Sequence, residues 1–301
     1  MKRLTRRQAI AMLGGTLGYV LLGPRATLGR ALPRAAIASK GDASSLTRAA
    51  IEAIGGMGCF VKPGARVVVK PNIGWDRRPE QGADTHPEVV AEIVRLAREA
   101  GASRVLVMDH TCNEPRRCYR RSGIQDAVKA AGGKMVHLRP NRAVEMDVGG
   151  ELIRRWPVFK EIVEADVLIN APVAKHHSLS LASLGMKNWF GAIAGERSRL
   201  HQNVPLASVD LANFFRPALT VMDATRVLVR NGPQGGNPED VIHPGMVMAS
   251  VDPVAADAFG ASLLHLGFDQ MPHLKLAEQR GLGSARWEDA PDIIRVEART
   301  G

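Results

Sequence analysis

The sequence has few cysteines and few aromatic residues, and both shortages exclude classes of function. Only Cys59, Cys112 and Cys118 occur in 301 residues, and they form no C-x-x-C pair. Three cysteines cannot build a disulfide framework, and an iron–sulfur cluster held by this chain alone is not expected. Aromatic residues make up 4% of the chain, too few to predict a stacking surface for single-stranded nucleic acid.

Several motifs of common enzyme folds are also missing. The chain contains no G-x-G-x-x-G, no G-x-x-x-x-G-K-[ST], no G-x-S-x-G and no H-E-x-x-H. Interpretations as a dinucleotide-binding protein, a P-loop protein or a serine hydrolase therefore lose most of their support, and the sequence signal for a metal is weak.

Acidic residues are absent from one part of the chain, and this explains its basic charge. The formal net charge is +10, but residues 1–38 contain seven lysines and arginines and no acid. The remainder carries a charge of about +3. Because the excess belongs to the N-terminus rather than to a surface of the folded protein, no nucleic-acid partner is predicted.

This N-terminus resembles a twin-arginine export signal. Thr5-Arg6-Arg7-Gln8 precedes a modestly apolar run over residues 9–22, which falls short of the roughly 20 apolar residues of a membrane-spanning helix. Ala36 and Ala38 form an A-x-A pair, which predicts cleavage after Ala38. An uncleaved anchor is the alternative.

The signal predicts where the protein works. We expect a periplasmic or otherwise extracytoplasmic location, the twin-arginine translocase as partner during export, and no stable membrane span after cleavage. The twin-arginine route exports folded proteins, often after a cofactor has been inserted, which favours a cofactor here. The cofactor is unknown, and a divalent metal is one candidate. Residues 39–301 are expected to form a single α/β domain.

The remaining sequence alternates between buried-strand and helix patterns. Val67, Val68 and Val69 form a β-branched run typical of a strand buried on both faces, and Gly149-Gly150 predicts the turn of a hairpin over residues 142–158. The pattern predicts an α/β fold with a mostly parallel sheet, helices on both faces and a small hairpin insertion. Expected strands span residues 66–70, 105–108, 135–138, 167–169, 219–222, 247–251 and 293–296; expected helices span 46–54, 87–100 after a Thr85 cap, 123–131, 159–164, 253–266 and 272–279.

Five expected strands end in polar residues. These ends are Lys70/Asn72, Asp109, Asn170 with Lys175, His176 and His177, Asp223, and Asp252. Right-handed crossovers bring the carboxyl ends of parallel strands to one edge of a sheet, where ligands bind. We therefore expect Lys70, Asn72, Asp109, Lys175, His177 and Lys187 around one cavity.

The lysines and histidines of this set suggest two kinds of ligand. Lys70, Lys175 and Lys187 together could hold a carboxylate or phosphate, or they could form structural ion pairs with Asp109, Asp223 or Asp252. His177, His201 and His86 are the candidate metal ligands. His176 and His177 cannot both face one site if they lie in a strand.

A second polar loop follows Asp109. Cys118 lies close to Arg116 and Arg117, which could lower the pKa of its thiol, and a disulfide between Cys112 and Cys118 is the alternative. Asp252 precedes Pro253 and could simply cap a helix.

These residues fall in motifs that resemble a known family. VKPNIG at 69–74, THP at 85–87, ADVLINAPVAKHH at 165–177 and LGMKNWFG at 184–191 resemble the domain-of-unknown-function 362 family, and so do VMDA at 221–224, NGP at 231–233 and DPVAADA at 252–258. The resemblance implies an α/β protein of bacterial or archaeal type. Some members carry a ferredoxin-like module, whose cysteine runs this chain lacks. The residues that match the most characteristic motifs are Lys70, Asn72, Lys175, His177, Lys187 and Asn188.

Three functions are compatible with this pattern. The first is an exported enzyme or cofactor-dependent redox protein that binds a small anionic ligand, with Lys175, His177 and Asp109 as catalytic residues and with Lys70, Asn72, Lys187 and Asn188 holding ligand or cofactor. Asp109 or Asp223 would orient His177, and proton abstraction next to a carboxylate, as in a racemase, would suit this set. The second is a non-catalytic metal- or cofactor-binding or assembly protein of the periplasm. The third is a structural protein whose polar strand ends are ion pairs.

Overall fold

The β-branched runs form neighbouring parallel strands at the centre of a large sheet. In the computed structural model, which describes residues 32–298, Val67 lies opposite Val167 and Val69 opposite Ile169. These side chains are all buried, so both strands pack on both faces, as their unbroken apolar pattern predicted.

The helices and strands have the following bounds. The strands are β1 (Ala35–Ser39), β2 (Arg66–Pro71), β3 (Arg104–Val107), β4 (Lys134–Met135), β5 (Ala143–Asp147), β6 (Arg155–Phe159), β7 (Val167–Ala171), β8 (Val173–His177), β9 (Leu181–Ser183), β10 (Leu219–Leu228), β11 (Val241–Ile242), β12 (Met246–Ser250) and β13 (Ile293–Glu297). The α-helices are α2 (Ala43–Ala53), α3 (Pro87–Glu99), α4 (Pro115–Arg121), α5 (Ile124–Ala130), α6 (Lys160–Val163), α7 (Gly185–Asn188), α8 (Val204–Phe215), α9 (Pro253–Ser262) and α10 (Pro272–Gln279).

The main sheet is mostly parallel, as predicted. Its strands run in the order β13-β1-β12-β10-β7-β2-β3-β4. Three further strands branch from this order: β8 and β11 pair with β10, and β9 pairs with β8. Along this order only β12 is reversed, since it pairs antiparallel with both β1 and β10. β5 and β6 form the separate antiparallel hairpin expected over residues 142–158.

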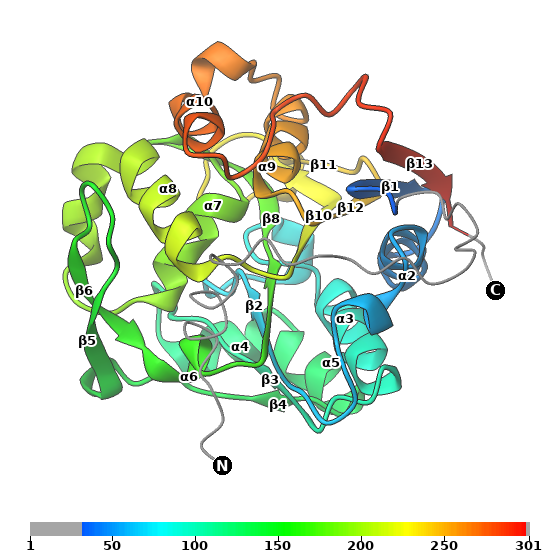
Figure 1. Cartoon of the computed structure of the whole chain (residues 1–301), viewed down its shortest axis with the longest axis horizontal. Coiled ribbons are helices and arrows are strands. Elements are labelled where there is room, and N and C mark those ends of the chain that lie inside the picture. Colours follow the sequence, from blue (N-terminus) through cyan, green and yellow to red (C-terminus); the bar gives the residue numbers. More distant parts are fainter. Residues whose placement is uncertain (1–31, 299–301) are drawn as a thin grey trace, which may run out of the picture.

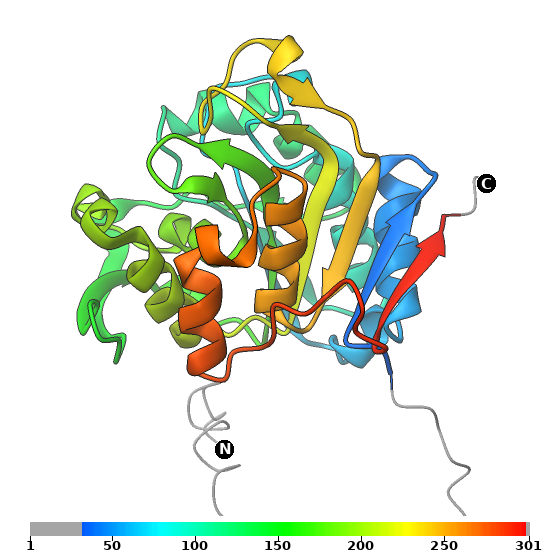
Figure 2. The ribbon, with the colours of Figure 1, turned by 90° about the horizontal axis from the view of Figure 1, so that it is seen from above.

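Helices cover both faces of the sheet, and each face has its own core. Figure 1 shows α2, α3 and α5 on one side and α7, α8, α9 and α10 on the other, and Figure 2 shows the sheet between them. Along β2, Val67 and Val69 pack into the first core, whereas Val68 packs into the second. The period of two in a strand thus sends successive side chains to opposite cores.

The reversal of β12 corrects one sequence-based expectation. Asp252 follows β12 and therefore lies at the opposite edge of the sheet from the ends of β2, β3 and β7. Its carboxylate accepts hydrogen bonds from the backbone N–H of Val254 (2.8 Å) and Ala255 (2.9 Å) and pairs with Arg34 at 2.7 Å. Asp252 is a helix cap rather than part of a site.

The sequence analysis missed three helices, α4, α7 and α8, and assigned one cap wrongly. Helix α4 is rich in arginine and has only a short buried face, α7 has only 4 residues, and most of α8 is buried, so that it has no clear polar stripe. His86, not Thr85, caps α3, because its Nδ1 accepts a hydrogen bond from the Glu88 N–H at 3.1 Å. Thr85 instead donates its hydroxyl to the carbonyl of Ala171 at 2.8 Å.

The folded domain begins before residue 39, which corrects the predicted boundary. β1 pairs with β12 on one side and with β13 on the other, and Ala35, Ala36, Ile37 and Ala38 are all buried. Cleavage after Ala38 would remove four of the five residues of this strand. The twin-arginine motif itself lies outside the described residues. Within residues 32–298, no helix has both the length and the apolarity needed to cross a membrane.

Removal of residues 1–38 is expected to lower the free energy of unfolding by at least about 3 kcal/mol, because it exposes apolar surface around Ile37 and leaves Asp252 without Arg34. Removal of residues 1–31 is the matched control and should change the free energy by less than about 0.5 kcal/mol. Urea unfolding of both truncations measures the difference. Equal stability would contradict the assignment of β1 to the folded core.

Candidate functional site

A cavity of about 550 Å³ opens at the carboxyl ends of the parallel strands. It lies beside the ends of β2 and β8, the loop after β3, and the segment from α7 to the 3₁₀ helix Arg197–Asn203. Eight of the nine site residues predicted from the sequence line it: Lys70, Asn72, Asp109, Lys175, His177, Lys187, Asn188 and His201. Residues far apart in sequence therefore meet at one sheet edge, as the strand pattern predicted.

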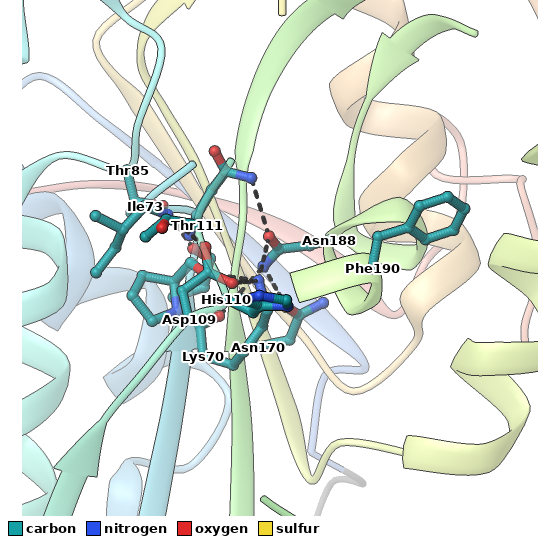
Figure 3. Close-up of polar contacts among 12 residues, drawn as sticks. Lys70, Ile73, Thr85, Asp109, His110, Thr111, Asn170, Asn188 and Phe190 are labelled. Atoms are coloured by element: carbon teal, nitrogen blue, oxygen red, sulfur yellow. Dashed lines mark hydrogen bonds and ion pairs between the residues drawn. The ribbon is translucent and has the colours of Figure 1, made fainter. Parts of the chain in front are cut away.

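Lys70 and Asp109 form a buried ion pair at the base of this cavity (Figure 3). Lys70 Nζ lies 2.7 Å from Asp109 Oδ1 and donates hydrogen bonds to the carbonyl of Pro71 (2.9 Å) and to Asn188 Oδ1 (2.8 Å). Burial lowers the pKa of Lys70, and the Asp109 carboxylate opposes this effect. Because all three ammonium hydrogens have protein partners, Lys70 fixes the structure of the site rather than offering a hydrogen bond to a ligand.

Asn188 connects this pair to the neighbouring strands. Its Nδ2 donates to the carbonyl of Lys70 at 3.2 Å and to Asn170 Oδ1 at 2.8 Å, while its Oδ1 also accepts from Asn72 Nδ2 at 3.1 Å. Asn170 Nδ2 in turn donates to the carbonyl of Gly185 at 2.9 Å. These hydrogen bonds hold helix α7 against β2 and β7. They thereby fix the backbone position of Lys187, which lies in this helix.

Lys175 enters the cavity from β8. Its Nζ donates to Asn72 Oδ1 at 2.9 Å and to the carbonyl of Ala83. Burial lowers the pKa of Lys175 to about 8, against the attraction of Asp84. Asp84 is itself buried, which raises the pKa of its carboxyl to about 7. Two of the three hydrogens of the Lys175 ammonium are bound within the protein, and one remains for a ligand.

Lys187 differs from the other two lysines. Its Nζ lies 5.2 Å from the centre of the Phe190 ring, and it makes no hydrogen bond or ion pair with any residue in the range 32–298. Burial, together with the positive charges of Lys175 and Arg197, lowers the pKa of Lys187 to about 7. Its ammonium therefore brings unused hydrogen-bond donors to the cavity.

Arg197 adds a fixed positive charge that the sequence analysis did not identify. Its guanidinium donates to the backbone carbonyls of His110 (2.8 Å), Thr111 (3.0 Å) and Phe190 (3.2 Å) and lines the cavity. No motif or periodicity marked this residue, since it begins a 3₁₀ helix that was not predicted. With Lys70 neutralised by Asp109, the charges of Lys175, Lys187 and Arg197 make the cavity suitable for an anion.

His177 is a neutral histidine. Its Nδ1 accepts a hydrogen bond from the Leu179 N–H at 3.1 Å, which assigns the ring proton to Nε2. Burial lowers the pKa of His177 to about 3, and Lys187 and Lys175 contribute to this shift. Its ring stacks on His201 with 6.1 Å between the ring centres. On β8 the side chain of His176 alternates with it and contacts the Gly232 N–H instead.

Neither carboxylate proposed to orient His177 does so. Asp109 binds Lys70 and accepts from the Ile73 N–H at 2.7 Å. Asp223 accepts from the His86 N–H at 2.7 Å and from the Thr225 hydroxyl at 2.7 Å. Both carboxylates bind backbone N–H groups of neighbouring loops, and Asp223 lies within β10, which continues to Leu228 instead of ending at Asp223 as predicted.

The proposed metal site and the proposed reactive cysteine are also corrected. His86 caps α3 outside the cavity, so it cannot join His177 and His201. Between residues 32 and 298, no group of three or more His, Cys, Asp or Glu side chains could hold a metal ion. Cys118 is buried, which raises the pKa of its thiol to about 12, and Cys112 and Cys118 are free thiols rather than a disulfide.

Residues 67–262 match the family model described as a domain of unknown function, DUF362. The chain belongs to this family. It is 32% identical over 244 residues to a thylakoid-associated protein of Synechocystis sp., a match that covers 78% of this chain and 74% of the relative. Among solved structures, the lactate racemase apoprotein from Thermoanaerobacterium thermosaccharolyticum aligns with a TM-score of 0.49 and 14% identity, over 75% of this chain and 56% of its own.

The part of the chain matched to DUF362 contains every cavity residue that the sequence analysis selected. Two further residues of this DUF362 domain were missed: Arg197 and Asp84. Gly191 lies against the ion pair, and a methyl group there would overlap the Asp109 carboxylate and lie 2.7 Å from Lys70 Nζ. A glycine inside the LGMKNWFG motif could have suggested such a close approach.

Substitution of Gly191 by alanine is expected to destabilise the DUF362 domain by about 1–3 kcal/mol, because the added methyl group separates Lys70 from Asp109. Gly58→Ala is the matched control, since nothing lies within 4 Å of its added methyl group. Urea unfolding of both variants measures the effect. If Gly191→Ala were as stable as Gly58→Ala, the close packing of the ion pair would be refuted.

Proposed function

We propose that the protein is an enzyme that binds a small carboxylate in the lysine-lined cavity and moves a proton at the carbon next to that carboxylate. The observation that carries this proposal is the position of Lys187. Its ammonium enters a cationic cavity and has no hydrogen-bond or ion-pair partner among the described residues. A base must be able to reach its substrate, and the other two lysines are already bound within the protein.

The carboxylate of the substrate would be held by two positive charges, those of Lys175 and Arg197. Lys175 has one free hydrogen, and Arg197 contributes charge from a fixed position. Because these groups are held by backbone carbonyls and by Asn72, they need little reorganisation when an anion enters. The rigid network around Lys70 and Asp109 keeps the strand ends in place.

Lys187 would accept the proton from the substrate, and His177 would stabilise the negative charge that this leaves. A lysine whose pKa is about 7 is neutral in part of the molecules at neutral pH and can accept a proton from carbon. The proton would pass from the substrate carbon to Lys187 Nζ and return to the opposite face of the same carbon, which inverts the configuration of that carbon with no net gain or loss of protons or electrons, as in a racemisation. His177, which is neutral and protonated on Nε2, would donate a hydrogen bond to the negative charge that develops on the carboxylate oxygens.

The size of the cavity favours a second candidate function. About 550 Å³ lies within the range of cofactor sites, roughly 300–1,000 Å³, and exceeds what a small carboxylate alone fills. Binding of an anionic cofactor without turnover would use the same positive charges. Turnover of a carboxylate by the purified protein distinguishes the enzyme from such a carrier.

The charge of Lys187 predicts a pH dependence of anion binding. Its pKa in the folded protein is lowered to about 7, so the ammonium is present below that pH and is lost above it. The affinity for acetate, measured by NMR titration, should fall above pH 7 by up to about tenfold per pH unit.

Two variants test this assignment. Lys187→Arg keeps its charge, so between pH 6 and pH 9 its affinity for acetate should fall less steeply than that of the wild-type protein, and the remaining fall comes from Lys175, whose pKa is about 8. Lys187→Met should weaken acetate binding by about tenfold or more at pH 6. If the wild-type protein bound acetate equally at pH 6 and pH 9, Lys187 would not be the titrating group of the site.

We also propose that the protein is exported through the twin-arginine translocase, with Arg6-Arg7 as the recognised pair. Replacement of both arginines by lysine is expected to reduce the exported fraction by about tenfold or more, because the paired guanidinium groups are not replaced by ammonium groups. Immunoblots of periplasmic and cytoplasmic fractions measure this. N-terminal sequencing of the exported protein should place the mature N-terminus at or before Arg34, since β1 follows directly.

A further inference from the structure

A second pocket of about 370 Å³ adjoins the lysine-lined cavity. Leu179, Leu184, Lys187 and His201 line both spaces. Lys187, whose ammonium has no hydrogen-bond or ion-pair partner among the described residues, therefore lies at the junction of the two spaces. The second pocket continues from this junction between the β8–β9 turn and the helices α8, α9 and α10.

Ser208, on α8, lines this pocket and has an unused hydrogen-bonding group. The residue is 2% exposed, and its hydroxyl makes no hydrogen bond with any residue that the structure describes. A buried hydroxyl without a partner costs free energy, so natural proteins seldom leave one unless a water or a ligand completes it. Ser208 is thus a polar contact in a pocket that nothing in the proposed reaction uses.

Asp257 and His273 lie on the wall of the same pocket. Asp257 accepts hydrogen bonds from the N–H groups of Gly185 (2.6 Å) and Met186 (3.1 Å), and His273 Nε2 lies 3.2 Å from its Oδ2. The pair joins α9 to α10, and both residues line the pocket. The hydrogen-bonding group that the pocket offers without a partner is the hydroxyl of Ser208, which can donate and accept.

Apolar side chains line part of the second pocket. Leu179 and Leu181, at the β8–β9 turn, are 71% and 45% exposed, and the buried Val204 and Met271 also line the pocket. Leu181 has a φ of +62°, a left-handed conformation that a leucine seldom adopts. Exposed leucines held in this way at the wall of a pocket offer a contact to an apolar part of a ligand.

We infer that the substrate has two parts, an anionic head bound in the lysine-lined cavity and a hydroxyl group bound by Ser208 in the second pocket, joined by a short apolar segment. This inference rests on the proposed function and adds the substrate class to it, namely a hydroxylated aliphatic carboxylate. The hydroxyl of such a substrate can donate a hydrogen bond to the Ser208 hydroxyl or accept one from it. Lys187, at the junction, would lie near the carbon that joins head and tail.

A series of ω-hydroxy carboxylates from 3-hydroxypropionate to 8-hydroxyoctanoate, each compared with the plain acid of the same length, tests the inference by NMR titration of the wild-type protein. At one chain length the hydroxy acid should bind at least about fivefold more tightly than the plain acid, because only then does its hydroxyl reach Ser208. In Ser208→Ala that preference should disappear. Gln202→Trp, a change at an exposed side chain that lines only the second pocket, should weaken binding of the long acids and leave acetate binding unaltered.

The outcomes separate this inference from the proposed function. If acetate binds and Lys187→Met weakens it, but no chain length shows a preference for the hydroxy acid, the two-part substrate is wrong and the anion site stands. A preference that survives in Ser208→Ala also overturns the inference. If no carboxylate binds the wild-type protein, or if Lys187→Met changes nothing, both proposals fail. Thermal unfolding of each variant confirms that it is folded.

Discussion

Lys70 and Asp109 place two opposite charges inside the protein, 2.7 Å apart, where neither could be buried alone. An isolated buried charge costs several kcal/mol, so each residue requires the other to be present and correctly placed. The surrounding residues meet this requirement: Asn188 and the Pro71 carbonyl take the remaining hydrogens of Lys70, and Gly191 leaves the space that the pair occupies. The segment from β7 to α7 is therefore arranged around a charge pair as much as around an apolar core.

This pair also determines the charge of the cavity beside it. Asp109 neutralises Lys70, and within residues 32–298 no carboxylate forms an ion pair with Lys175, Lys187 or Arg197. Burial lowers the pKa of Lys187 and of His177, and the neighbouring positive charges contribute to both shifts. A lysine whose pKa lies near neutrality and a histidine that is neutral at pH 7 are thus consequences of burial in one cationic cavity.

The sequence predicted the residues around the cavity better than their individual roles. Unbroken apolar runs such as Val67–Val69 identify parallel strands, because a strand that is buried on both faces has no polar position. Parallel strands in turn bring their carboxyl ends together at one edge of the sheet. Nothing in the run before Asp252 shows that β12 is reversed, since a buried strand has the same apolar pattern in either direction. In the same way, Lys70 and Lys187 both belong to characteristic motifs, yet only the structure distinguishes the lysine that is bound within the protein from the one that is not. His86 failed as a ligand because a side chain beside a helix start has a local use, as a cap, that spacing alone does not reveal.

The position of Lys187 at the junction of two pockets has a chemical consequence. A base must approach the reacting carbon closely, whereas the groups that hold a substrate can act from its two ends. Here the fixed charges of Lys175 and Arg197 lie in one space, and the unused hydroxyl of Ser208 lies in the other. Asp257 binds the first N–H groups of α7, the helix that carries Lys187, and its partner His273 lines the second pocket. A substrate that filled both spaces would contact this wall as well as the base, so that binding of its tail would help to hold Lys187 in the position where proton transfer occurs.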